Sequence, residues 1–258
     1  MQTFLTAGPA EFQEASRFGV PLAHAAYHIG PGSTLLRQSL PLRARGGLLL
    51  AGDRDAPTVT DPEAVCAAAI RECSRRDYGG VVLDFEGPPR PDLLALARRL
   101  GERLAERGLA LYLPEPYGEA APEAFILIGT ALSGGQYRER LEEAAKRWGG
   151  YQRLALDAER LRMDFPLPCP TGVGTPLWSA EFQVLVEQES PAVFFSPELC
   201  ARYFTCVREG KHHFVLFDDA GTLREKLRIA AELGIGTAFF SWPEVEDMAE
   251  ELFASSLP

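Results

Sequence analysis

The segment Tyr78-Gly79-Gly80-Val81-Val82-Leu83-Asp84-Phe85-Glu86 decides the fold, because it is an apolar strand that ends in two acidic residues. Successive side chains of a strand point to opposite sides, so we expect Val82, Asp84 and Glu86 on one face. In a closed parallel barrel this face is the interior, and functional groups gather where the strands end. The segment therefore predicts a barrel strand with Asp84 and Glu86 at the mouth.

Short apolar segments of strand character recur along the whole chain, each followed by a helix or a loop. This alternation is typical of a parallel sheet covered by helices. Eight such strands are predicted, over residues 2–5, 23–28, 47–51, 80–86, 109–113, 125–129, 152–156 and 236–242. A (β/α)8 TIM barrel has about 250 residues, and the chain has 258. We therefore predict a single α/β barrel domain over residues 1–258.

Helix boundary signals lie between the predicted strands. Asp61-Pro62 and Pro91-Asp92 each place an acidic residue beside a proline at a helix start. The helical stretches QYRERLEEAAKRWGG (136–150) and GTLREKLRIAAELGIG (221–236) end on glycine, a common residue at helix ends. Each predicted helix stops directly before a strand, as βα repeats require.

The segment from Asp157 to Asp218 is too long for an ordinary βα loop. It contains PLPCPTGVGTP (166–176), an apolar helix-like stretch and the strand-like HHFVLF (212–217). We predict an inserted α+β segment between the seventh and eighth strands. Such insertions usually form one wall of the ligand cleft, and a purely structural lid is the alternative.

Composition excludes several classes of partner. The net charge of −10 repels phosphate backbones, and no basic stretch with interleaved aromatic residues offsets it, so no nucleic acid is expected. The five cysteines form no CxxC pair, which predicts a reduced protein without metal or other cofactor. The start has no basic and apolar leader, and no stretch approaches a membrane span. A cytoplasmic protein is expected, and its oligomeric state is left open.

The two acids at the end of the predicted fourth strand have a chemical use. A second carboxylate nearby raises the proton affinity of the first, so that a general acid stays protonated near neutral pH. Glu86, the residue nearer the mouth, is then the candidate acid. The alternative is an acidic pair that only binds loop amides or an arginine.

YGGVVLDFE (78–86) resembles the fourth-strand signature D-G-x-D-x-D-x-E of the chitinase-like family 18 glycoside hydrolases. The resemblance implies that Glu86 protonates the glycosidic oxygen and that Asp84 supports it. Gly79 and Val82 stand where the family has its first two acids. The segment FVLFDDAGTLREKLRIAAELGIGTAFFSW (214–242) is similar to the family's closing block, which implies that Trp242 forms an apolar floor beneath the sugar.

The resemblance implies a retaining hydrolase of β-1,4-linked N-acetylhexosamine glycans, of chitin or peptidoglycan type. In this family the substrate's own acetamido group is the nucleophile. The similarity is closest to short bacterial members associated with spore or cell-wall processing, which implies such a location here. A catalytically inactive carbohydrate-binding or structural barrel of the same family is the alternative.

The sixth strand of that family carries a Met-x-Tyr-Asp motif, which the resemblance implies would hold the acetamido group. The corresponding stretch here, 125–131, reads FILIGTA and lacks both polar groups. The expected substitutes are Asp84 and the tyrosines of neighbouring strands and loops, Tyr27, Tyr112 and Tyr117. Asp53 and Asp55 follow the third strand and are candidates to bind sugar hydroxyls, with solvated loop acids as the alternative.

Overall fold

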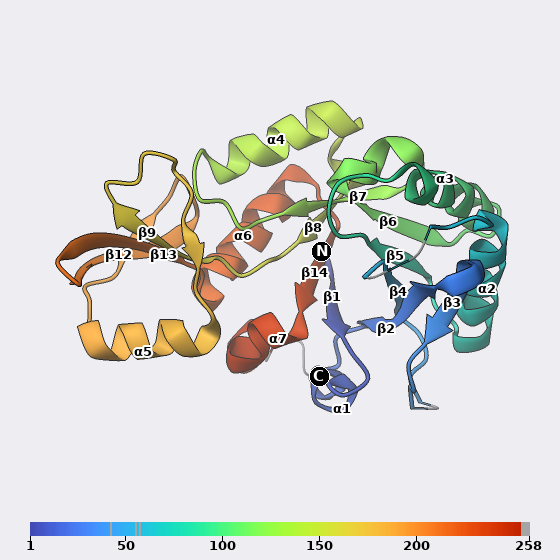
Figure 1. The fold of residues 1–258 in the computed structure, drawn as a ribbon, viewed down its shortest axis with the longest axis horizontal. Coiled ribbons are helices and arrows are strands. Elements are labelled where there is room, and N and C mark those ends of the chain that lie inside the picture. The colour runs from blue at the N-terminus through green and yellow to red at the C-terminus, as the bar shows by residue number, and fades with distance from the viewer. Residues whose placement is uncertain (42, 55, 57, 254–258) are drawn as a thin grey trace.

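The computed structural model describes residues 1–41, 43–54, 56 and 58–253, and they form the predicted barrel (Figure 1). Its parallel strands are Gln2–Ala7 (β1), Leu22–Gly30 (β2), Leu48–Gly52 (β4), Gly80–Asp84 (β5), Ala110–Pro114 (β6), Phe125–Gly129 (β7), Leu154–Asp157 (β8) and Thr237–Ser241 (β14). β1 pairs with both β2 and β14, which closes the barrel. All eight predicted strands are confirmed. A further strand, Thr34–Arg37 (β3), pairs antiparallel with β2.

Helices cover the outside of the barrel at the predicted places. The longer ones are Pro62–Arg76 (α2), Pro91–Ala105 (α3), Tyr137–Trp148 (α4) and Ala220–Leu233 (α6). The Asp61 carboxylate accepts a hydrogen bond from Ala64 N at 3.1 Å and so caps α2. Gly149 and Gly234, both in the left-handed conformation, end α4 and α6. Short helices are Phe12–Ala15 (α1), Trp242–Val245 (α7) and Ala249–Phe253 (α8), with a 3-10 segment at Glu115–Ala120 (η3).

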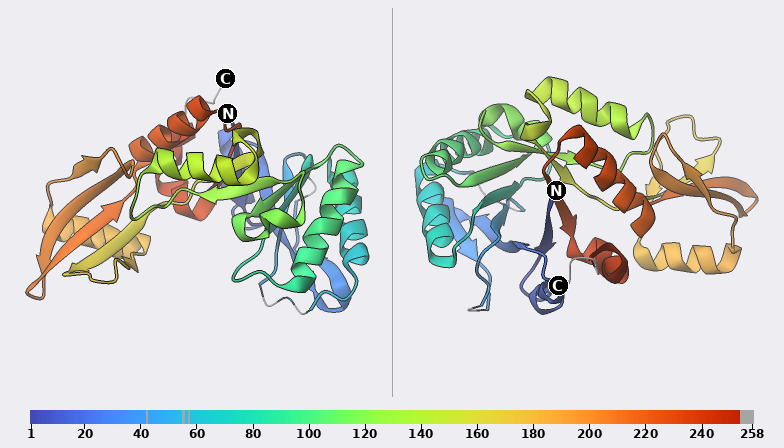
Figure 2. Two further views of the ribbon diagram at one scale, coloured as in Figure 1. Left: turned by 90° about the horizontal axis from the view of Figure 1, so that it is seen from above. Right: turned by 180° about the vertical axis from the view of Figure 1, so that it is seen from behind.

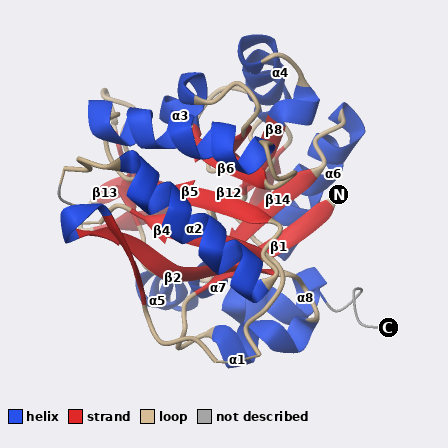
Figure 3. Cartoon of the chain, turned by 90° about the vertical axis from the view of Figure 1, so that its right-hand side faces the viewer, coloured by secondary structure: helices blue, strands red, loops and turns tan. Residues whose placement is uncertain are grey.

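Alternation along each strand divides the apolar residues between two cores. On β5, Val82 faces the barrel interior, where it joins Phe4, Tyr112 and Phe239. Val81 and Leu83 belong to the outer core, which α2 and α3 cover. Figure 3 shows these two helices lying over the strands from the outside. The predicted inward direction of Val82 is thereby confirmed.

The predicted insertion forms an antiparallel sheet with one helix. Its elements are Arg162–Leu167 (β9), Thr175–Pro176 (β10), Ser179–Glu189 (α5), Phe194–Ser196 (β11), Ala201–Arg208 (β12) and Lys211–Phe217 (β13), and the sheet order is β10-β9-β13-β12-β11. Phe182 and Leu185 of α5 pack against Phe204 and Phe217 in a core of their own. In both views of Figure 2 this segment lies at the opposite end of the molecule from α2 and α3.

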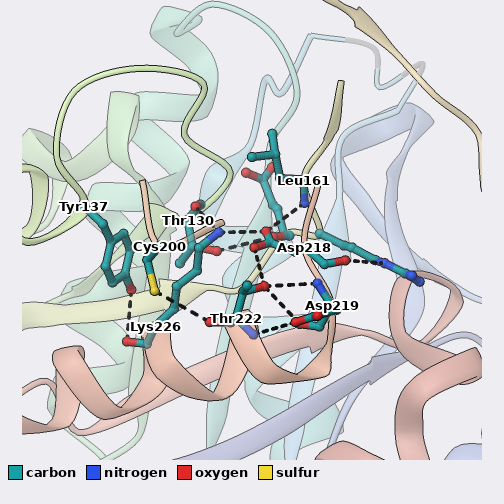
Figure 4. A network of polar contacts seen from close by, with 10 residues as sticks. Thr130, Tyr137, Leu161, Cys200, Asp218, Asp219, Thr222 and Lys226 are labelled. Atoms are coloured by element: carbon teal, nitrogen blue, oxygen red, sulfur yellow. Dashed lines mark hydrogen bonds and ion pairs between the residues drawn. The ribbon is translucent and has the colours of Figure 1, made fainter. Parts of the chain in front are cut away.

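A buried ion pair joins the insertion to the barrel (Figure 4). Lys226 of α6 donates to Asp218 at 2.7 Å and to the main-chain oxygen of Thr130, after β7, at 3.0 Å. Asp218 also accepts hydrogen bonds from Leu161 N at 3.0 Å and from the Thr222 hydroxyl at 2.8 Å. The network therefore ties the chain after β7 and the two ends of the insertion to α6.

Candidate active site

Asp84 and Glu86 lie at the mouth of the barrel, as expected. Asp84 is the last residue of β5 and Glu86 follows two residues later. Asp84 lines a cavity of about 420 Å³, the central cavity, whose walls come from the ends of several strands. Asp84 and Glu86 together line a second cavity of about 420 Å³, the Glu86 cavity, beside β2 and β4.

The central cavity continues toward the insertion. A third cavity of about 220 Å³, the insertion cavity, shares Ala131, Arg160 and Glu244 with it. Asp84 and Leu50 are likewise common to the central and Glu86 cavities. The three cavities thus adjoin, and we call them together the mouth groove. Beyond Arg160, the insertion lines this third cavity with Leu161, Arg162, Met163, Pro176, Leu177 and Trp178.

Trp178 is a groove residue that sequence reasoning missed. Its side chain is 77% exposed although it lies on the wall of the insertion cavity. A flat, exposed indole on a groove is a ready surface for the apolar face of a sugar ring. It stands between PLPCPTGVGTP and the start of α5, and the sequence showed only that this region was an insertion.

The acidic pair has a distinct electrostatic environment. The surrounding protein limits hydration of Asp84 and raises the pKa of its carboxyl, and the negative charges of Glu86 and Asp53 raise it further. Arg54 opposes this shift. Arg54 also lies 3.3 Å from the Glu86 carboxylate, but both side chains are largely exposed, so this pair contributes little to stability. Glu86 therefore remains accessible in the groove.

Two of the predicted sugar-binding residues hold the segment that carries Glu86. Asp53 is buried, and its carboxylate accepts a hydrogen bond from Glu86 N at 2.8 Å. Tyr117 of η3 is also buried, packs against Phe85 at 5.0 Å between ring centroids, and accepts a hydrogen bond from Arg90 N at 3.3 Å. Both side chains thus position residues 85–90. Asp55 lies outside the described residues.

The hydroxyl groups of the two other predicted tyrosines point away from the groove. Tyr27 borders the Glu86 cavity, but its hydroxyl donates to Glu72 of α2 at 3.1 Å, on the outside of the barrel. The Tyr112 ring is buried in the interior core, stacked on Phe125. Neither hydroxyl is placed to orient a ligand at Asp84.

Trp242 does not form the floor expected from the closing block. Alternation on β14 turns Phe239 and Ser241 into the central cavity and Phe240 outward. The strand ends at Ser241, and Trp242 begins α7 on the outer side, where it is buried near Phe18. This position corrects the expected role, because the indole does not reach the groove.

Two acids at the end of the seventh barrel strand, Asp157 on β8 and Glu159 just after it, also line the central cavity. Burial raises the pKa of Asp157 to about 7, with further contributions from Glu159, Asp84 and Glu244. Partial loss of hydration at the cavity wall, and then the charge of Glu244, likewise raise the pKa of Glu159. The sequence did contain a signal for Asp157. It directly follows the predicted strand 152–156, at the end of the strand that faces the barrel mouth.

The part of the chain that the structure describes offers neither a metal-binding cluster nor a membrane-spanning helix. In that part of the chain, no group of three or more His, Cys, Asp or Glu side chains is arranged to hold a metal ion. None of its helices is long and apolar enough to cross a membrane.

Structural comparison agrees with this geometry. The spore cortex-lytic enzyme SleL of Bacillus megaterium superposes with a TM-score of 0.66 at 14% identity, over 98% of this chain and 74% of the enzyme. The chain has a chitinase-like TIM barrel. A GH18 chitinase from Cycas revoluta, solved with (GlcNAc)4, matches at 0.67 and 14% identity over 99% of both chains. The class V chitinase of Nicotiana tobaccum matches at 0.69 and 11% identity, over 98% of this chain and 97% of that one.

Comparison of the amino-acid sequence with known families and curated proteins gives no match. No protein-family model matches the chain, and the search of curated proteins returned no match. At 11–17% identity to the solved structures, the likeness is one of fold. The chemistry must therefore be argued from the residues of the groove.

Proposed function

We propose that this chain is a retaining glycoside hydrolase of β-1,4-linked N-acetylhexosamine glycans, of chitin or peptidoglycan type, with Glu86 as general acid and base. The observation that carries the proposal is the position of Asp84 and Glu86 at the end of β5, together on one groove. Mouth residues at strand ends are where TIM barrels perform catalysis. The similar structures, which include a spore cortex-lytic enzyme and a chitinase in complex with (GlcNAc)4, support the substrate class.

The proposed reaction has two steps. First, Glu86 donates its proton to the glycosidic oxygen, the bond from this oxygen to C1 breaks, and the acetamido oxygen of the same sugar bonds to C1. The leaving glycan departs as an alcohol and a cyclic oxazolinium ion remains. Water then attacks C1 and gives a proton to Glu86, while the bond between C1 and the acetamido oxygen breaks; this restores the acetamido group, the original anomeric configuration and the protonated Glu86. An ionised Asp84 accepts a hydrogen bond from the acetamido N–H and stabilises the positive charge.

The length of the mouth groove favours an extended oligosaccharide over a single sugar. Glu86 lies in one terminal cavity and Trp178 lines the other, with Asp84 and Asp157 in the cavity between them. A bound chain would thus run from β2 across the barrel to the insertion. A role in spore or cell-wall processing is consistent with such a polymer and is part of the proposal.

The test is hydrolysis of fluorogenic N-acetylglucosamine oligomers by the wild type and by Glu86→Gln, which removes the proton but keeps the shape. We expect turnover by the wild type and a loss of at least a hundred-fold in the variant, the usual contribution of a positioned acid. Glu119→Gln, at an exposed carboxylate outside the groove, is the matched control and should retain full activity. Equal rates for the wild type and Glu86→Gln would refute the role of Glu86.

A non-catalytic glycan-binding barrel is the second candidate. The observation that favours it is at the end of the sixth barrel strand, where Gly129 offers no side chain to orient an acetamido group. If the wild type binds oligomers but never cleaves them, this second function replaces the first.

A further inference from the structure

We propose that Asp157 is a further catalytic residue of this site, which as a neutral carboxyl donates a hydrogen bond to the acetamido oxygen of the reacting sugar. This inference rests on the proposed function and specifies how the substrate would be oriented. It assigns a role to a residue on β8, which two strands separate from β5 and its acidic motif.

The main chain around Asp157 fixes its position. Asp157 is the last residue of β8 and pairs in register with Gly129 on β7. Its carbonyl oxygen accepts a hydrogen bond from Thr130 N at 3.1 Å, and the next residue, Ala158, donates to Phe239 O at 2.8 Å. Both neighbouring strands therefore hold the backbone at the rim. Since Ala155 faces the interior core, alternation also turns the Asp157 side chain inward.

The carboxyl of Asp157 is free to meet a ligand. It lines the central cavity together with Asp84, and no side chain of the described residues makes a hydrogen bond or ion pair to it. Beside its neighbour in register, Gly129, the Glu159 side chain takes the place of a side chain at position 129, because a Cβ there would lie 2.8 Å from a Glu159 carboxylate oxygen.

The charged groups that face the cavity favour a proton on Asp157. Asp84 comes from β5, Glu159 from the chain after β8, and Glu244 from α7, and all three are acids. Among the described residues that line this cavity, Arg160 is the only base, and it donates to Asp247 at 2.7 Å and to the Glu244 carbonyl oxygen at 3.1 Å. Arg162 pairs with Glu244 at 3.3 Å, but no cation of the described residues forms an ion pair with Asp157. The like charges near Asp157 are relieved when this carboxyl is neutral, and burial raises its pKa to about 7.

A neutral and an ionised carboxyl on one cavity match the two polar atoms of an acetamido group. The N–H donates to the ionised Asp84, and the carbonyl oxygen accepts from Asp157. This oxygen is the atom that bonds to C1 in the first step, so the contact aligns it. The Asp157 proton stays on Asp157 throughout, while the Glu86 proton moves to the leaving oxygen.

The test measures the affinity for (GlcNAc)4 by calorimetry between pH 5.5 and 8.5, in a Glu86→Gln background that prevents cleavage. With a pKa of about 7 for Asp157, we expect affinity to fall about thirty-fold from pH 6 to pH 8.5 as the donor ionises. Adding Asp157→Asn keeps an N–H donor, so affinity should stay constant over this range. Adding Asp157→Ala should weaken binding roughly ten-fold at pH 6.

Adding Glu159→Gln to the same background is the matched control. It removes an acid of the same cavity but leaves Asp157 in place. The affinity should still fall as the pH rises, with the midpoint of this fall at a lower pH, because one negative charge near Asp157 is gone. Binding that is independent of pH, or an Asp157→Asn curve that follows its parent, would overturn the role of Asp157 alone. An absence of binding in every variant would instead overturn the proposed function and this inference with it.

Discussion

Replacement of Lys226 by methionine tests how the insertion is held. Lys226 and Asp218 are 1% and 0% exposed and lie 2.7 Å apart. Lys226→Met keeps an apolar chain of similar length but leaves Asp218 buried without its counter-charge. Breaking a buried ion pair by removing one partner costs about 3–5 kcal/mol, because the remaining charge is not compensated. We expect the lower part of this range, since Leu161 N and the Thr222 hydroxyl still donate to Asp218.

The assay is chemical unfolding followed by tryptophan fluorescence and circular dichroism. Lys146→Met, at an exposed position on α4, is the matched control and should change the free energy of unfolding by less than about 0.5 kcal/mol. Asp218→Asn combined with Lys226→Met should recover part of the loss, because no buried charge remains. A loss below about 1 kcal/mol for Lys226→Met would refute the buried pair as the anchor between insertion and barrel.

Three further changes probe the groove, the Glu86 segment and the outer core. Trp178 lines the end of the groove farthest from Glu86, so Trp178→Ala should weaken the binding of long N-acetylglucosamine oligomers by about 1 kcal/mol and leave the binding of short ones unchanged. Binding titrations with oligomers of increasing length test this. Tyr117→Phe should lower the free energy of unfolding by about 0.5–1.5 kcal/mol, since Arg90 N loses an acceptor, and raise hydrogen exchange at residues 85–90. Burial lowers the pKa of His24 to about 4. The unfolded chain therefore binds a proton at this residue at higher pH than the folded one, and the free energy of unfolding should fall by about 3 kcal/mol between pH 6.5 and 4. In acid titrations, His24→Gln should remove this pH dependence.

The barrel could be predicted from the sequence because its strands and helices are specified locally. The stretch 80–84 is apolar and bounded by turn residues, and Asp61 and Asp219 cap helices by bonds to residues three positions ahead. Asp84 and Glu86 were found for the same reason, since a strand's direction and period determine where its end points. The insertion was located by its length, but its sheet order depends on long-range pairing that no local pattern shows.

The remaining groove residues were harder to predict because they depend on where a strand stops. Trp242 lies one residue past the end of β14 and turns outward with α7, so resemblance to a motif gave it the wrong direction. Asp157 lies at the end of β8 and does face the cavity, yet its significance comes from acids that are distant in sequence, Asp84 and Glu244. The contacts of Asp53 and Tyr117 could not be predicted either. Their side chains accept hydrogen bonds from the main chain of Glu86 and Arg90, in a loop whose path only the folded structure shows.

The most direct test of the central claim is a crystal structure of the Glu86→Gln variant with (GlcNAc)4. We predict that the glycan lies in the mouth groove, with a glycosidic oxygen within hydrogen-bond distance of the substituted side chain and an acetamido group between Asp84 and Asp157. Sugar bound elsewhere on the surface, or a groove that remains empty at saturating ligand, would contradict the assignment of this barrel mouth as a glycan site.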